Sequence, residues 1–332
     1  MITMLFVWIG IFIASLFGLV KGSEWVMRGA ERIGIHFGLS RFTIGVLIVG
    51  VGTSLPEFAS GIASLLHGTS EIATANVIGS NIFNILVIIG VSAIIGKKLV
   101  VTKDLMDSEL PIFIVATLIF LGVAYDGKII FIESLLLFAA YLVYLLHTLR
   151  DKDEESPVVA EIKSDIKSLK PKLTSGVLVA FFLGLAGLLA GAKYLVDAVL
   201  SISGSFGVAP EILTLLAVAA GTSIPELMMS LRALKEGKSD IAIGNVFGSN
   251  AFNLLMVLGL PGLFSTLSLS PISYTIGLPT LAAATFIFLI FGISKKVYSW
   301  EGYMLLLLFV FLGVASYDER FVIEKKLKIA EI

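Results

Sequence analysis

Long apolar runs restrict the fold of this chain more than any other feature of its sequence. A helix needs about 20 apolar residues to cross the hydrocarbon core of a bilayer, and ten runs reach or approach that length. They are Ile2–Val20, Phe42–Leu66, Ile72–Ile95, Pro111–Ala124, Ile129–Leu149, Leu173–Leu200, Ile212–Leu231, Ile241–Phe264, Ile272–Ile293 and Tyr303–Ala315. Lipid offers the backbone no hydrogen-bond partner, so spans must be helices or barrel strands, and these runs lack the alternation of barrel strands. We therefore expect an all-α polytopic membrane protein with ten transmembrane helices, of which the fourth and tenth are short.

The composition agrees with a membrane protein. Of the 332 residues, 57% are hydrophobic and 15% charged, whereas soluble domains are about a quarter charged. The net charge of −1 leaves no basic surface that would indicate a nucleic-acid partner. Cysteine is absent, which excludes disulfides, thiolate metal sites and cysteine nucleophiles. The partners we expect are ions and the lipid bilayer, and we expect the protein to work as a monomer.

The sequence also repeats itself at an offset of 169 residues. The segment GTSLPE at 52–57 returns as GTSIPE at 221–226, and GSNIFN at 79–84 returns as GSNAFN at 248–253. Both pairs align without a gap. The repeat predicts two five-helix units, the first over residues 1–149 and the second over residues 173–332. The polar segment 150–172 between them is expected to be a cytoplasmic linker.

An odd number of spans in each half predicts that the two halves enter the membrane from opposite sides. If the loops are assigned to faces on this basis, 17 basic residues fall on one face, and the short loops of the other face hold one. Basic residues collect in cytoplasmic loops. We therefore expect a multi-pass protein of the cell membrane, built from inverted repeats, with both termini outside the cytoplasm.

Inverted repeats whose helices are interrupted at matching positions are typical of transporters with a site near the bilayer midplane. Pro56 and Pro225 interrupt the backbone in corresponding spans. The residues that follow, Glu57 and Glu226, are acidic and lie near the middle of these spans. A charged side chain there costs about 2.5–3.5 kcal/mol on insertion scales. No Lys or Arg lies near either in its own span, so we expect a cation from solution to neutralise the pair.

The residues around the glutamates offer only oxygen ligands. Thr53 precedes Glu57 by four residues and Ser80 precedes Asn84 by four, so each pair shares one face of a helix, and the second half repeats both pairs. Carboxylate, amide and hydroxyl oxygens suit Ca²⁺ and Na⁺ rather than softer metals. Two negative charges balance one Ca²⁺ or two Na⁺. Alternate occupancy of one oxygen cage on an inverted scaffold predicts antiport.

The paired GTSxPE and GSNxxN motifs resemble the α-repeats of the cation/Ca²⁺ exchanger superfamily, in particular its Na⁺/Ca²⁺ exchanger branch and the prokaryotic sodium/calcium antiporters. The resemblance covers nearly the whole chain. It implies five plus five helices, with ligands from the second, third, seventh and eighth, and alternating access by sliding of the first and sixth. It also implies the site residues: Glu57 and Glu226 for Ca²⁺ with carbonyls near Thr53 and Thr222; Ser54, Ser80, Ser223 and Ser249 with the carbonyls of Gly50 and Ala219 for Na⁺; and Asn84 and Asn253 at the centre.

Other interpretations stay open at this stage. Proton-coupled relatives usually carry GNxxE where this chain has GTSxPE, which favours Na⁺, and an H⁺/Ca²⁺ or other divalent-cation antiporter is the main alternative. A cation channel could use the same oxygens. Asn81 and Asn250 fit helix packing as well as ion contact. We expect neither an enzyme nor a cofactor, because no candidate base lies near the serines of the motifs.

Overall fold

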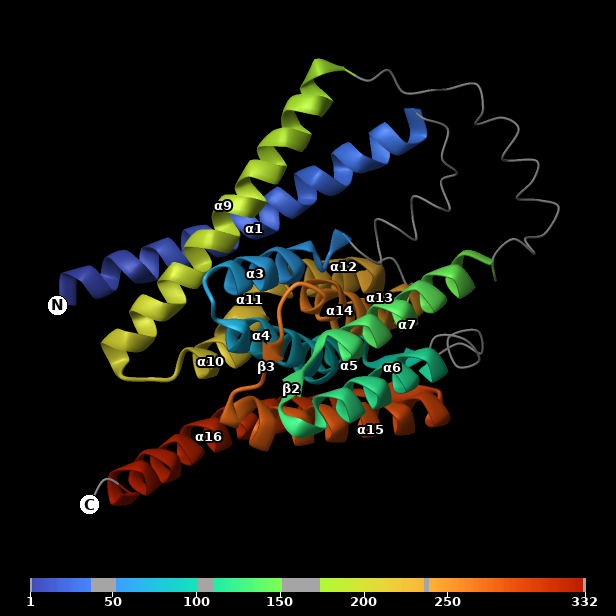
Figure 1. Cartoon of the computed structure of the whole chain (residues 1–332). Helices are drawn as coiled ribbons and strands as arrows, with labels where there is room; N and C mark the ends of the chain where they lie inside the picture. The colour runs from blue at the N-terminus through green and yellow to red at the C-terminus, as the bar shows by residue number, and fades with distance from the viewer. Residues whose placement is uncertain (1, 37–51, 101–109, 151–173, 236–238, 331–332) are drawn as a thin grey trace.

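The computed structural model describes residues 2–36, 52–100, 110–150, 174–235 and 239–330 of the chain (Figure 1). The first half contains α1 (Ile2–His36), α3 (Leu55–Leu66), α4 (Ser70–Phe83), a π-helical segment (Asn84–Ile88), α5 (Ile89–Gly96), β1 (Lys98–Val100), α6 (Leu110–Val123), a 3₁₀ turn (Ala124–Asp126), β2 (Lys128–Ile129) and α7 (Phe131–Arg150). Helices cover most of the described part of this half, as the apolar runs predict.

The second half contains α9 (Ser175–Phe206), α10 (Pro210–Leu213), a π-helical segment (Thr214–Val218), α11 (Ala219–Thr222), α12 (Ile224–Lys235), α13 (Ser239–Phe252), a π-helical segment (Asn253–Val257), α14 (Gly259–Gly262), β3 (Leu267–Ser268), a π-helical segment (Ser273–Gly277), α15 (Leu278–Ser294), β4 (Lys296–Tyr298) and α16 (Ser299–Ala330). Several elements correspond across the halves at the offset seen in the sequence. Adding 169 to the bounds of α3 gives those of α12, and the same holds for α4 and α13.

The described helices account for ten spans. Six are long and apolar enough to cross a bilayer by themselves, a bent pair at Pro210–Thr222 and Ile224–Lys235 forms a seventh, and three shorter apolar helices lie at Leu55–Leu66, Leu110–Asp126 and Phe131–His147. The start of the second predicted run, at residues 42–51, lies outside the described residues. The protein is therefore a helical, multi-pass membrane protein with the architecture of two inverted five-helix repeats.

The expectation of an entirely helical chain needs one small correction. Two short antiparallel ribbons join helix ends from different halves: β1 pairs with β4, and β2 pairs with β3. Leu99 and Val297 are buried on the inner face of the first ribbon, and Ile129 and Leu267 on the inner face of the second. The sequence did not indicate these strands, because two or three residues in a loop carry no detectable periodicity.

The arrangement of the helices separates a buried centre from an outer layer. The spans Ser70–Gly96 and Ala242–Gly262 are mostly enclosed by protein, whereas α1, α9 and α16 expose much of their surface. α1 and α9 cross each other on one side of the bundle (Figure 1). The start of α1 and the end of α16 point to the same side in this view. The two central spans carry the GSNxxN motifs, whose serine and asparagine side chains are buried.

Candidate ion-binding site

Each GTSxPE motif leads into the first turn of a helix, and in the second half it lies at a break between two helical segments. In the first half, α3 begins directly after Ser54 and carries Pro56 in its first turn. In the second half, Pro210–Thr222 and Ile224–Lys235 meet at 41°, with Ser223 between them. The two serines have nearly the same backbone conformation, with φ −90° and ψ 12° at Ser54 and φ −83° and ψ 10° at Ser223. Proline cannot donate to the preceding turn, which explains a break at this position in both halves.

The break places both glutamates at the start of a helix. Glu57 lies in the first turn of α3 and Glu226 in the first turn of α12. Both side chains are fully buried, with an exposed fraction of 0%. The helix macrodipole favours a negative charge at this end by about 0.3–1 kcal/mol and up to about 2 kcal/mol when partly buried. This is less than the cost of burying a carboxylate, so the helix ends alone do not neutralise the pair.

Hydroxyl groups from one half bind the glutamate of the other. Ser54 Oγ donates to Glu226 Oε1 at 2.9 Å, and Ser223 Oγ donates to Glu57 Oε1 at 3.1 Å. Ser80 Oγ also donates to Glu57 Oε1, at 3.4 Å. These contacts join residues far apart in the chain, and the first two are related by the repeat. The two carboxylates therefore belong to one polar centre to which both halves contribute.

The threonines of the motifs extend this centre in the same symmetric way. The hydroxyls of Thr53 and Ser249 are 3.3 Å apart, and those of Ser80 and Thr222 are 3.5 Å apart. All four side chains are at most 2% exposed. The centre is thus lined by carboxylate and hydroxyl oxygens from the two breaks and from α4 and α13.

One oxygen of each glutamate has no hydrogen-bond partner. Glu57 Oε2 and Glu226 Oε2 are both buried without a partner among the described residues. The ion pairs within the described residues involve Glu24 and Asp197, and neither central glutamate. A buried carboxylate oxygen without a donor or a positive partner is costly. The two free oxygens are therefore suited to a cation, which would replace the missing partners.

The GSNxxN segments also carry a group of buried asparagines. Asn84 Nδ2 donates to Asn250 Oδ1 at 2.9 Å, which links the two halves. Asn84 Oδ1 and both polar atoms of Asn253 are buried and have no partner among the described residues. Asn84 and Asn253 each begin a π-helical segment. π-Helical segments are rare overall, and those that occur often lie at functional sites. The sequence indicated the two asparagines but not the π-helical geometry.

The remaining predicted positions are the two backbone carbonyls. The carbonyl of Ala219 accepts a bond from Thr222 Oγ1 at 3.3 Å and one from the backbone N–H of Ser223 at 3.1 Å, so here the protein itself uses that oxygen. Gly50 lies outside the described residues. The structure therefore brings the predicted glutamate, threonine and serine side chains together. It buries Asn84 and Asn253 on the segments that carry Ser80 and Ser249, and the first-half carbonyl stays undescribed.

Sequence reasoning missed three serines that position the site. Ser60 Oγ accepts from Asn76 Nδ2 at 2.8 Å, and Ser230 Oγ accepts from Asn245 Nδ2 at 3.3 Å. Ser23 of α1 donates to the carbonyl of Gly52 at 2.8 Å. Ser60 and Ser230 follow the glutamates by three and four residues, and this spacing on one helix face could have indicated them. Nothing in the sequence of α1 marks Ser23.

The site contains no softer ligands. Among the described residues, no group of three or more His, Cys, Asp or Glu side chains is placed to hold a metal ion. Besides the two carboxylates, the oxygens come from hydroxyl, amide and carbonyl groups. Hard cations such as Ca²⁺ prefer this donor set.

Comparisons with known proteins agree with this chemistry. The model of the sodium/calcium exchanger protein family matches residues 7–150 and 176–317. The sodium/calcium exchanger MaX1 of Methanosarcina acetivorans is 31% identical over 344 residues, which cover 92% of this chain and 98% of that protein. The inner membrane protein YrbG of Escherichia coli is 31% identical over 267 residues, which cover 79% of this chain and 82% of that protein.

A solved structure gives the same fold. The sodium-calcium exchanger NCX_Mj, soaked with Na⁺ and Sr²⁺, superposes with a TM-score of 0.62 at 29% identity, covering 92% of this chain and 98% of that chain. The similarity thus extends over both halves and includes the segments that carry the buried glutamates.

Proposed function

Because this chain belongs to the sodium/calcium exchanger protein family, we propose that it is a secondary active antiporter that exchanges Na⁺ for Ca²⁺ across a membrane by alternating access. The observation that carries this proposal is the buried pair Glu57 and Glu226, each with one unpartnered carboxylate oxygen and without a basic partner among the described residues. MaX1 and NCX_Mj are both named as exchangers of these two ions.

The charge of the site supports exchange rather than one-way transport. Two carboxylates balance one Ca²⁺ or two Na⁺, and an empty site keeps two negative charges in a low-dielectric interior. The change between faces is therefore favourable only with cations bound. A site that must be filled in order to move couples the export of one ion to the import of the other.

The residues around the pair support roles for the other positions. We assign Glu57, Glu226, Thr53 and Thr222 to Ca²⁺, and Ser54, Ser80, Ser223 and Ser249 with the carbonyls of Gly50 and Ala219 to Na⁺. Asn84 and Asn253 complete the centre. This division follows the resemblance of the motifs to the exchanger family. The serine hydroxyls already bind the two carboxylates, so a cation that enters changes contacts in both halves at once.

The pair α1 and α9 is suited to be the moving part. Both helices expose much of their length, and they pack tightly against each other. Ser23 of α1 holds the carbonyl of Gly52 beside the first motif, so movement of α1 reaches the site directly. We place the protein in the cell membrane, with both termini outside the cytoplasm; the relative YrbG is named an inner membrane protein.

A reconstituted flux assay tests this function. Purified protein in vesicles loaded with Na⁺ should take up ⁴⁵Ca²⁺ when external Na⁺ is low, and uptake should stop when an ionophore collapses the Na⁺ gradient. Uptake driven by a pH gradient in the absence of Na⁺ would replace Na⁺ with H⁺ as the coupling ion. Ca²⁺ entry that needs no opposing gradient would indicate a channel and contradict antiport.

A further inference from the structure

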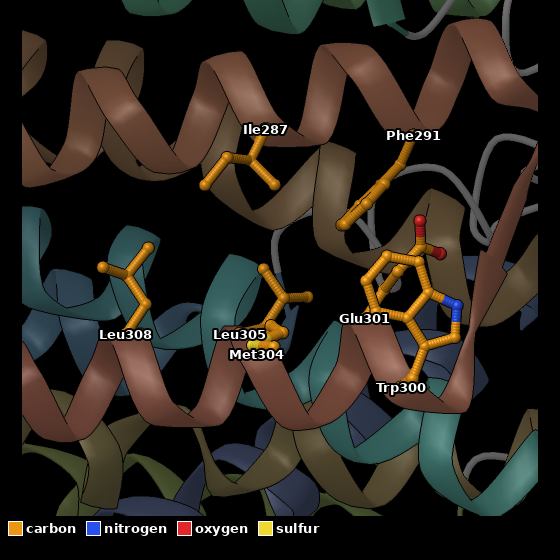
Figure 2. Close-up of a pocket in the computed structure, with 7 residues that line it drawn as sticks. All are labelled: Ile287, Phe291, Trp300, Glu301, Met304, Leu305 and Leu308. Atoms are coloured by element: carbon orange, nitrogen blue, oxygen red, sulfur yellow. The ribbon is translucent and has the colours of Figure 1, made fainter.

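A groove on the outside of the bundle lies between α15 and α16, away from the ion site (Figure 2). It has a volume of about 270 Å³ and is lined by Ile287, Phe291, Trp300, Glu301, Met304, Leu305 and Leu308. Leu305 and Phe291 are buried, at 3% and 7% exposed, whereas Trp300 and Met304 are 63% and 60% exposed. The groove thus has an apolar floor and a rim on the outer surface of the protein.

One end of the groove meets the β1–β4 ribbon. In Figure 2 the rings of Phe291 and Trp300 face each other from the two helices at this end, and Ile287 and Leu308 lie at the other. Phe291 belongs to the last turn of α15 and Trp300 to the first turn of α16, and the strand β4 (Lys296–Tyr298) connects these turns. The end of the groove is therefore a few residues from the strand.

This ribbon carries a concentration of positive charge. Four lysines, which we call the ribbon lysines, lie on it or directly before its strands: Lys97, Lys98, Lys295 and Lys296. All four are exposed, and none forms an ion pair with a described residue. The pairing of Lys98 with Tyr298 and of Val100 with Lys296 places these side chains on one face, because Leu99 and Val297 occupy the buried face.

Two of these lysines stand where glycine would be expected. Lys97 directly follows α5 and Lys295 directly follows α15, both in the left-handed backbone region, with φ of 59° and 57°. This conformation is unfavourable for a residue other than glycine. A lysine at a helix C-terminus recovers part of this through the helix dipole. That explanation does not extend to Lys98 and Lys296, which lie on the strands.

The other face of the molecule offers a comparison, because the repeat places an equivalent ribbon there. The β2–β3 ribbon carries Lys128, and the left-handed residue before β2 is Gly127. Counted from these ribbons, the positions equivalent to Trp300 and Glu301 are Ile132 and Glu133. The combination of several lysines and a tryptophan therefore belongs to one of the two ribbons.

We propose that the groove and the ribbon lysines form a binding site for an anionic phospholipid, with one acyl chain in the groove and the phosphate headgroup on the lysines. The apolar acyl chain matches the apolar groove, and the negatively charged headgroup matches the lysines at the end of the groove. Anionic headgroups attract basic residues beside a membrane, and tryptophan prefers the level of the headgroups. The one acidic residue of the lining, Glu301, accepts the backbone N–H of Tyr298 at 2.7 Å, so it caps α16.

Quenching of Trp300 by brominated lipid tests this site. The chain has three tryptophans, and a Trp8→Phe, Trp25→Phe variant keeps Trp300 as the only one. This variant is reconstituted in bilayers that mix phosphatidylglycerol and phosphatidylcholine, with brominated chains on one lipid at a time. We expect phosphatidylglycerol to be preferred at Trp300 on the order of ten-fold.

Three further variants separate the two parts of the site. Changing Lys98, Lys295 and Lys296 together to Gln should abolish the preference, and Lys128→Gln on the opposite ribbon should leave it intact. Ile287→Phe with Leu308→Phe, which fills the groove, should reduce quenching by phosphatidylglycerol to the level of phosphatidylcholine. Equal quenching by both lipids in the starting protein would overturn the site. So would an equal loss in Lys128→Gln, or a preference that survives filling of the groove. Melting temperatures in detergent check that each variant is folded.

Discussion

At the scale of single residues, the site is defined by the free-energy cost of burying two carboxylates, which the protein's own groups offset only in part. Glu57 and Glu226 are fully buried, and each keeps one oxygen without a partner. The hydroxyls of Ser223 and Ser54 satisfy the other oxygens. Bonds to charged groups contribute about 1.5–3 kcal/mol each, which makes the carboxylates tolerable without making them neutral. The residual charge is what an arriving cation binds.

Replacing either glutamate by glutamine tests the need for charge. Glu57→Gln or Glu226→Gln keeps the shape and an acceptor oxygen and removes one negative charge. Removing one carboxylate from a buried contact with Ca²⁺ costs about 2–5 kcal/mol. Ca²⁺ flux in vesicles should therefore fall at least about thirty-fold. Glu133→Gln is the matched control. Glu133 Oε2 accepts the backbone N–H of Ile130 at 2.8 Å at the start of α7, and the amide oxygen of glutamine can accept the same bond. Normal flux in either site variant would refute the assignment.

The bond between Asn84 and Asn250 predicts coupling between the two halves. Asn84→Ala leaves Asn250 Oδ1 buried without its donor, and Asn250→Ala removes the acceptor of Asn84. Each change should lower the thermal stability of the protein in detergent, and the double variant should lose less than the sum, by about 0.5–3 kcal/mol. Strictly additive losses would mean that the two amides do not support each other.

At the scale of elements, glycines decide how closely α1 and α9 approach. A Cβ added at Gly22 would lie 2.7 Å from the carbonyl oxygen of Gly184, and one at Gly184 would lie 2.7 Å from Cβ of Trp25. Such distances require the helices to move apart. Small residues at a crossing allow this close packing in membranes, so the two outer helices form one tightly packed pair.

A pair of alanine substitutions tests this packing. Gly22→Ala should destabilise the protein by about 1–3 kcal/mol through overpacking, seen as a lower melting temperature in detergent. Gly10→Ala on the same helix is the control, because a Cβ there meets nothing within 4 Å. It should leave the melting temperature unchanged. An equal loss in both variants would show that the α1–α9 contact does not determine the result, because helix propensity favours Ala over Gly at both positions.

At the scale of the whole molecule, the repeat relates the two halves element by element. The pairs α3 with α12 and α4 with α13 have bounds that differ by the repeat offset. Each ribbon consists of one strand from each half. Exchange of strands between halves ties the ends of the bundle together. The domain limits at residues 149 and 173 remain a prediction, because residues 151–173 lie outside the described part of the chain.

The absence of cysteine makes the orientation directly measurable. Leu66 ends α3 and Lys235 ends α12, so they are equivalent positions, and both are exposed. Inverted halves place them on opposite faces. In intact cells, a membrane-impermeant maleimide should label a Leu66→Cys variant and should label Lys235→Cys only after permeabilisation. Labelling of both from the outside would contradict the inverted arrangement, and the reverse pattern would invert the assigned topology.

The sequence by itself determined the number of spans, the twofold repeat and the central glutamates. Apolar length and the lack of hydrogen-bond partners in lipid act on each segment separately, so they are visible in a single chain. Identical motifs at a constant offset need no contacts to be recognised. For the same reason Glu57 and Glu226 could be found as the acidic residues inside apolar spans.

Only the tertiary structure decided how the halves meet. That Ser54 binds Glu226 and Ser223 binds Glu57 depends on contacts across more than 160 residues, and no local pattern encodes which half donates to which. The two ribbons likewise join segments distant in the chain, and the groove beside Trp300 depends on how α15 packs against α16. Local chemistry chooses the spans, whereas the packing of spans against one another sets the partners of each buried polar group, because a hydrogen bond needs both groups within about 3 Å.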